Sequence, residues 1–269
     1  MPPEPFEVFA IRYARADNRH PGENFLLADP HEFASALDYF VWLLRRRDGC
    51  YLVDTGFSKE AAAQRGREWL RCPVDSLHLL GEDPIRIRDV ILTHLHYDHA
   101  GNFDRLPAAR FHLQDREMAY ATGRLMRHPA QRAPFDPENV VAMVRHVYSE
   151  KAVFHDGDAE LASGLSLHCI GGHSAGLQAV RIWTRRGWLV LASDASHLYA
   201  HFEKRRIFPI VYNISEMLEG YDRLLQLADS PDHIIPGHDP LVMEFYPAAK
   251  SGLEGIAVRL DADPRRPIA

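Results

Sequence analysis

The sequence predicts an α/β protein of αββα architecture, in which two mixed β-sheets pack together between outer helices. Three observations predict this arrangement. Short apolar runs typical of buried strands occur in both halves of the chain, helix-forming segments separate them, and clusters of ligand-type side chains follow the runs in each half. The 269 residues are ample for one substantial core. We therefore expect one domain over residues 1–269, with a helical insert at about 114–150 and a loose tail at 261–269.

The elements follow in order along the chain. Alternating or wholly apolar runs predict strands at 6–13, 37–44, 51–53 and 90–93. Helix-forming residues predict a helix at 59–70, and the insert is expected to be helical with breaks at Pro129, Pro134 and Pro137. A second series of apolar runs predicts strands at 152–155, 165–170, 179–184, 188–192 and 233–235. One apolar face along 215–228 predicts an amphipathic helix.

Composition narrows the class of protein. The net charge of -6 disfavours a nucleic-acid partner, because such binding depends on Lys and Arg neutralising phosphates. The three cysteines are odd in number and have no paired spacing, which favours a reducing compartment. The first residues lack the pattern of a signal peptide, and no apolar run approaches the length of a membrane span. We expect a cytoplasmic enzyme that acts without nucleic acid or membrane.

The densest polar cluster directly follows the apolar run at 90–92. It contains His94, His96, Asp98 and His99 at H-x-H-x-D-H spacing. Imidazole and carboxylate together suit zinc, and manganese, iron or cobalt are also compatible. On an extended segment His94 and His96 point to the same side, and the turn that follows can aim Asp98 and His99 at a second point. This spacing therefore offers ligands to two neighbouring metals.

Further motifs follow other apolar runs. Asp54 begins an Asp-Thr-Gly turn, His173 lies in Gly-His-Ser-Ala-Gly, Asp194 lies in Ser-Asp-Ala, and His238 lies in Pro-Gly-His-Asp. Each motif alone has a simpler interpretation as a turn, a loop or a helix cap. Together and in this order, from position 54 to 239, they resemble the metallo-β-lactamase-fold superfamily of metallohydrolases. The pattern is most similar to its N-acyl-homoserine lactonase-like branch.

The resemblance implies a binuclear centre with two Zn²⁺ per chain. It assigns His94, His96 and His173 to one metal and Asp98, His99 and His238 to the other, with Asp194 bridging both. Asp54 would support a ligand histidine from outside the coordination sphere. The implied reaction is attack of a metal-bridging hydroxide on a carbonyl carbon, with Asp98 managing a proton.

The function implied is opening of a lactone, an N-acyl-homoserine lactone or a similar ester. Lactonases of this branch often carry a tyrosine three positions after the bridging aspartate, where this chain has His197. His197 could replace the phenol as a catalytic donor, or Tyr199 or Tyr212 could reach the site. Alternatives are a thioester hydrolase resembling glyoxalase II, another ester or phosphodiester hydrolase, and an iron-dependent redox enzyme on the same fold. A homodimer is compatible with the family.

The helical insert is expected to form an apolar pocket wall beside the metals. Its members would be Met118, Tyr120, Leu125, Met126, Phe135, Val140 and Met143, joined from the other half by Phe202, Phe208 and Ile210. Such side chains would suit an acyl chain or an aromatic ring.

Overall fold

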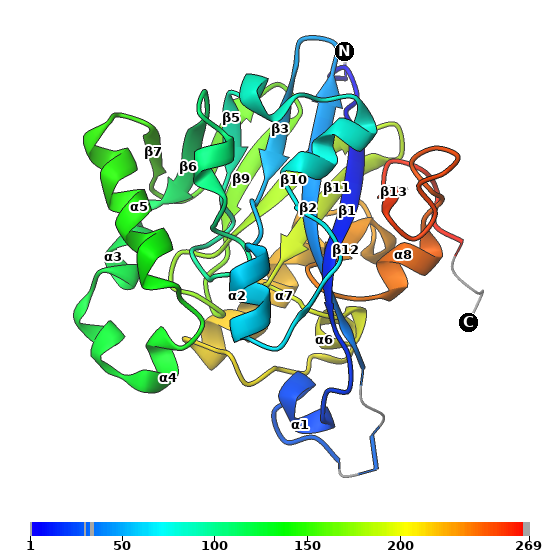
Figure 1. Ribbon diagram of the computed structural model, residues 1–269. Helices are drawn as coiled ribbons and strands as arrows, with labels where there is room; N and C mark the ends of the chain where they lie inside the picture. The colour runs from blue at the N-terminus through cyan, green and yellow to red at the C-terminus, as the bar shows by residue number, and fades with distance from the viewer. Residues whose placement is uncertain (1, 30, 33–34, 266–269) are drawn as a thin grey trace.

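The computed structural model describes residues 2–29, 31–32 and 35–265. Two mixed β-sheets lie between flanking helices, which confirms the αββα prediction (Figure 1). The larger sheet has the strand order β13-β1-β2-β3-β5-β6-β7, with β4 paired to β1. Its strands are β1 (Glu7–Ala16), β2 (Leu37–Arg46), β3 (Gly49–Val53), β4 (Glu68–Trp69), β5 (Asp89–Ile91), β6 (Arg110–Gln114), β7 (Ala152–His155) and β13 (Ala257–Arg259).

The second sheet has five strands in the order β12-β11-β10-β9-β8. They are β8 (Ala159–Ala162), β9 (Leu165–Cys169), β10 (Gln178–Thr184), β11 (Gly187–Ser193) and β12 (Ile234–Pro236). All pairings in this sheet are antiparallel except that of β11 with β12.

Helices flank the two sheets (Figure 1). The α-helices are α1 (Pro21–Asn24), α2 (Lys59–Gln64), α3 (Asp115–Ala121), α4 (Pro129–Arg132), α5 (Pro137–Tyr148), α6 (Tyr199–Lys204), α7 (Ile214–Leu227) and α8 (Leu241–Phe245). Short 3-10 helices are η1 (Asp75–Leu80), η2 (Pro84–Arg86), η3 (Phe103–Arg105), η4 (Arg124–Arg127) and η5 (Pro231–His233). Among the described residues, none of the helices combines the length and the apolar character that crossing a bilayer would need.

Alternation along the central strands explains the layered core. In β1, Phe9 and Ile11 belong to an outer core that includes Met143 of α5, whereas Val8 and Ala10 belong to the core shared with the second sheet. Side chains of a strand point alternately to its two faces, so both faces of β1 are apolar and both are covered. The amphipathic helix predicted at 215–228 is α7, whose Tyr221 packs in the core of the second sheet.

Two parallel pairings bring the ligand-type motifs together. Strands β3 and β5 are parallel, so Asp54 and the segment that begins at Thr93 leave the same edge of the larger sheet. Strands β11 and β12 are parallel, so Asp194 and His238 leave the same edge of the second sheet. The carboxyl ends of parallel strands are a common place for ligand sites, because chain segments diverge there.

Three further predictions concern the helix at 59–70, the helical insert and the C-terminal tail. The helix expected at 59–70 ends at Gln64, because Gly66 adopts a left-handed φ of 63° and β4 then pairs with β1. The insert holds α3, η4, α4 and α5, as its helical composition predicts. Of the tail expected at 261–269, Asp261 is buried and accepts a hydrogen bond from Val8 N, and residues 266–269 lie outside the described residues.

Candidate metal centre

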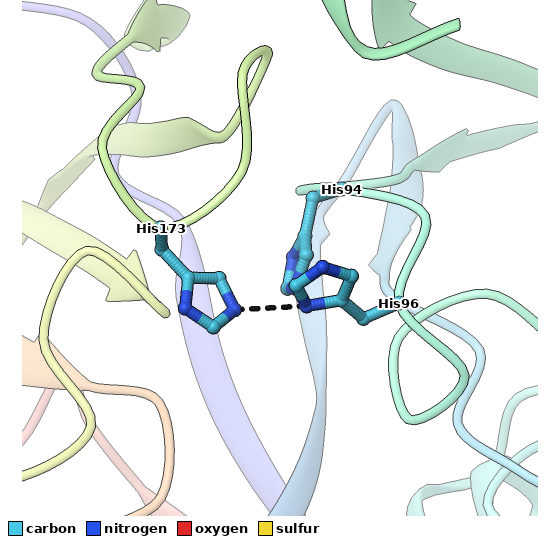
Figure 2. A group of neighbouring side chains, drawn as sticks. All are labelled: His94, His96 and His173. Atoms are coloured by element: carbon cyan, nitrogen blue, oxygen red, sulfur yellow. Dashed lines mark hydrogen bonds between the residues drawn. The ribbon is translucent and has the colours of Figure 1, made fainter. Parts of the chain in front are cut away.

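Three histidines from two loops point toward one another at the edge of the sheets (Figure 2). His94 and His96 follow β5, and His173 lies between β9 and β10. His173 Nε2 lies 2.9 Å from His96 Nδ1. Ligand-type atoms of these three buried residues lie within 4.8 Å of one another. The sequence-predicted first set is therefore brought together and could hold one metal ion.

Asp194 stands between this set and a second one. Its Oδ2 lies 3.2 Å from His173 Nε2 and 3.9 Å from His94 Nε2. Its Oδ1 lies 3.1 Å from His99 Nε2 and 3.0 Å from His238 Nε2. Each carboxylate oxygen thus faces a different group of imidazoles, which is the arrangement that a bridging ligand requires.

Asp98 completes the second set. Its Oδ2 lies 3.7 Å from both His99 Nε2 and His238 Nε2, and the three residues form a group that could hold another ion. The hydroxyl of Tyr13 donates to the backbone oxygen of Asp98 at 2.8 Å, which fixes this turn against β1.

Asp54 orients His99 by contacting Nδ1, the ring nitrogen that is turned away from Asp194. His99 Nδ1 lies 2.7 Å from Asp54 Oδ2, while Asp54 also accepts hydrogen bonds from the backbone N–H and the hydroxyl of Thr93 at 2.7 and 2.8 Å. Asp54 adopts a left-handed φ of 59°, a conformation that costs free energy for a residue with a Cβ. These bonds hold the carboxylate in place despite that cost and direct His99 Nε2 toward Asp194.

Two other histidines are held in the same way. His173 Nδ1 bonds to the carbonyl of Ile210 at 2.8 Å, and His238 Nδ1 bonds to the carbonyl of Asp38 at 2.9 Å. A carbonyl only accepts, so each Nδ1 carries the proton and each Nε2 keeps a lone pair directed at the centre. Both rings are therefore fixed in a ligating tautomer.

Burial and neighbouring charge set the protonation of these groups. Burial, reinforced by neighbouring imidazoles, holds the pKa of His94 and His96 well below the ordinary value. Burial alone would raise the pKa of Asp194, but the facing histidines, His238 and His99 foremost, hold it well below its usual range. Burial would lower the pKa of His99, yet Asp194 and Asp98 raise it. The site therefore favours a positive charge beside the two carboxylates, and a bound cation would supply that charge.

Orphaned polar atoms also fit a metal. Within the described chain, His94 Nε2, His99 Nε2 and Asp194 Oδ1 are buried and make no hydrogen bond of acceptable geometry. A buried polar atom left without a partner costs about 1–3 kcal/mol. Ligand-type atoms of these three residues lie within 4.8 Å of one another, and they match a nitrogen and oxygen donor set for divalent cations.

Glu117 on α3 braces two of the ligand loops, and the sequence analysis missed it. Its buried carboxylate accepts from Leu95 N at 2.9 Å and Gly176 N at 2.9 Å, and from the Ser174 hydroxyl. A Cβ at Gly176 would lie 2.2 Å from Glu117 N, so only glycine allows this approach. The sole sequence signal was the final glycine of the Gly-His-Ser-Ala-Gly motif.

The two candidate catalytic residues that follow Asp194 lie in different surroundings. His197 Nε2 lies 2.8 Å from Asp194 Oδ2, and its ring stacks on Phe208 with centroids 3.7 Å apart. Tyr199 is buried in the core of the second sheet, where its ring centroid lies 5.6 Å from that of Phe245. The structure therefore brings His197 to the metal-type cluster and places Tyr199 in the core beside it.

A cavity of about 320 Å³ opens onto this cluster, and its wall is lined by His96, Asp98, His173, Asp194, His197 and His238. The insert contributes Ala130, Gln131, Ala133 and Pro134, and Tyr97 N holds it there by donating to the Pro134 carbonyl at 2.9 Å. The insert therefore lines the cavity, as expected, but with other residues than those that the sequence predicts. Of the side chains expected there, Ile210 lines the cavity, whereas Tyr120, Phe135, Met143, Phe202 and Phe208 pack in the cores.

Comparison with known proteins agrees with this geometry. A family model described as the metallo-beta-lactamase superfamily matches residues 35–239. A probable metallo-hydrolase of Mycobacterium tuberculosis is 28% identical over 237 residues, which cover 77% of this chain and 73% of that protein. The N-acyl homoserine lactonase AiiB of Agrobacterium fabrum is 29% identical over 252 residues, which cover 81% of this chain and 88% of that protein.

The fold is also shared with a solved structure. An N-acyl homoserine lactone hydrolase, determined with the product N-hexanoyl-L-homoserine at its catalytic metal centre, superposes with a TM-score of 0.72 at 22% identity, over 91% of this chain and 96% of that one. Because the family model spans most of the chain and includes every motif that supplies the clustered histidines and aspartates, this chain belongs to the metallo-beta-lactamase superfamily.

Proposed function

We propose that this protein is a binuclear metal-dependent hydrolase that opens a lactone or a similar activated ester. The proposal rests above all on the position of Asp194. Its two carboxylate oxygens lie 3.0–3.2 Å from imidazoles of two different ligand sets. Membership of a metallohydrolase superfamily supports it, as do relatives named as lactonases.

The proposed ligands follow from the two groups of side chains. His94, His96 and His173 hold one ion, Asp98, His99 and His238 hold the other, and Asp194 contributes to both. Asp54 sets the tautomer of His99. We propose two Zn²⁺ per chain, and the same nitrogen and oxygen donors also accept manganese, iron or cobalt.

The two ions, when bound, would lower the pKa of a water toward neutrality and polarise the substrate carbonyl. The protein's own groups orient the reactants and handle protons. Asp98 is the one partly exposed ligand carboxylate, with a side chain 12% exposed, so its Oδ2 can accept a proton from water and return it to the leaving alkoxide oxygen.

We propose His197 as the residue that contacts the carbonyl end of the substrate, in the place where related lactonases often carry tyrosine. His197 lines the cavity next to Asp194. A part for Tyr199 would require its side chain to leave the core that it fills, so the structure favours His197.

The three thiols support the proposed reducing, cytoplasmic setting. Cys50, Cys72 and Cys169 are all free and half-buried. A homodimer is compatible with the resemblance to lactonases, and sedimentation analysis would test it.

A substrate panel on metal-analysed protein tests the function. N-acyl-homoserine lactones, simple lactones, a glutathione thioester and a phosphodiester would be compared, with Asp194→Ala as the variant that removes the bridging carboxylate. Two metals per chain and lactone opening, both lost in Asp194→Ala, are the expected result. Two metals with turnover of only thioester or phosphodiester would replace the substrate class. One iron per chain without hydrolysis would overturn the proposal in favour of a redox enzyme.

A further inference from the structure

Three arginines line the cavity that opens onto the metal-type cluster. They are Arg19, which follows β1, and Arg65 and Arg67, which follow α2. The carboxylates in the same lining are Asp98 and Asp194, both of which the proposed function assigns to metal ions. If both acids bind metal ions, the lining holds three positively charged side chains and no further carboxylate to balance them.

Arg65 and Arg67 are held by neutral partners. Arg65 donates to the carbonyls of Ala133 and Phe135, each at 3.0 Å, and its guanidinium carbon lies 3.8 Å from the ring centroid of Tyr97. Arg67 Nε donates to the Tyr97 hydroxyl at 3.2 Å. In the described part of the chain neither forms an ion pair within 4.0 Å, whereas Arg45, Arg205 and Arg259, for example, each meet a carboxylate.

Arg19 is largely enclosed by the protein. Its side chain is only 10% exposed, and the carboxylate it meets, that of Glu23, is 4.0 Å away and largely exposed. Nε donates to Asn24 Oδ1 at 2.6 Å, and Nη2 donates to the Glu23 carbonyl at 2.8 Å. Burying a charged group without a close counter-charge is unfavourable, so a ligand that brings an anion to this wall would gain binding free energy.

We propose that the lactone or ester substrate carries an anionic group, of which a carboxylate is the smallest organic example, and that Arg67 and Arg19 bind it at the wall of this cavity. The inference rests on the proposed function and adds the chemical class of its substrate. Arg65 is a positioning residue, because two of its nitrogens already hold the insert. Arg67 is the more available anchor. Among the described residues its hydrogen bond to Tyr97 uses Nε, which leaves both Nη groups for a ligand.

A matched pair of ligands tests this proposal. N-hexanoyl- and N-adipoyl-homoserine lactone have six-carbon acyl chains and differ at the chain end, which is a methyl group in one and a carboxylate in the other. We would measure kcat/KM for both, and by calorimetry the affinity for both ring-opened products, which needs no turnover. A charge-assisted contact predicts about a 10- to 100-fold preference for the adipoyl compound.

Substitution assigns the preference to the arginines. Arg67→Gln and Arg19→Gln should each reduce the adipoyl-to-hexanoyl ratio about tenfold or more, whereas Arg67→Lys should retain part of it. Arg47→Gln removes an exposed arginine outside the cavity lining and should leave the ratio unchanged. Thermal unfolding of each variant confirms that it is folded.

The outcomes separate this inference from the function on which it rests. Equal binding of the two products by the wild type, or a preference that survives both glutamine variants, overturns the anion site even if lactones are hydrolysed. A preference for the adipoyl product that both variants lose, in protein that opens no lactone, supports the anion site and refutes the lactonase function.

Discussion

Asp54→Asn should weaken metal binding without changing any proposed metal ligand. Asp54 Oδ1 accepts from the backbone N–H of Thr93 at 2.7 Å, and Oδ2 lies 2.7 Å from His99 Nδ1. Asparagine would keep its oxygen toward the fixed backbone donor and turn its NH₂ toward His99. His99 would then accept at Nδ1 and carry its proton on Nε2, the nitrogen that lies 3.1 Å from Asp194. A protonated Nε2 cannot bind a metal.

Partners that orient a ligand histidine typically contribute a factor of about 10–100 in metal affinity. We therefore expect Asp54→Asn to lower the affinity of one of the two ions by about 1.4–2.8 kcal/mol. The assay is the metal content of dialysed protein across a series of buffered free zinc concentrations.

The matched control is Asp158→Asn, because Asp158 Oδ2 lies 2.8 Å from His168 Nδ1 at a partly exposed site that contributes nothing to the cavity lining. This variant should bind both ions like the wild type. A zinc-binding curve for Asp54→Asn that coincides with those of the wild type and the control would refute the reasoning.

Three further results are expected. Glu117→Gln leaves the N–H of Gly176 or Leu95 facing an amide NH₂. The variant should therefore be less stable by about 1–3 kcal/mol, with a melting temperature lower by several degrees. An unchanged melting temperature would contradict the role of Glu117 in holding the two loops. Burial lowers the pKa of His201 from its ordinary 6.5 to about 4, so the unfolded chain binds more protons between these values and stability falls as pH drops through that window. His201→Gln should lose this part of the slope, as urea unfolding at pH 7 and pH 5 would reveal. His197→Tyr should keep or increase lactone turnover while His197→Phe lowers it; equal rates for both variants would show that the residue makes no polar contact with the substrate.

Much of the fold could be predicted because the signals are local. The alternation that places Phe9 and Val8 on opposite faces of β1 is visible in the sequence, and so are the apolar runs that end at Asp54 and Thr93. Short edge elements were less predictable. Strand β4 has only two residues, and its pairing with β1 is a tertiary contact that overrides the helix predicted for these residues.

The ligand-type residues were predictable because each follows a strand within a compact motif. Their supports were not, because these supports are contacts across long stretches of sequence. Glu117 resembles any acidic residue in the first turn of a helix, yet it bonds to Leu95 and Gly176. Arg19 and Arg67 belong to unremarkable segments, and only folding brings them to one cavity.

The central claim is that two ions, sharing Asp194, are needed to open a lactone. Titration of metal-free protein with zinc, with opening of N-hexanoyl-homoserine lactone followed at each addition, tests it most directly. The account predicts that activity rises to a plateau at two equivalents of zinc per chain. Full activity at one equivalent would contradict the binuclear centre, and two tightly bound equivalents without lactone opening would contradict the proposed reaction.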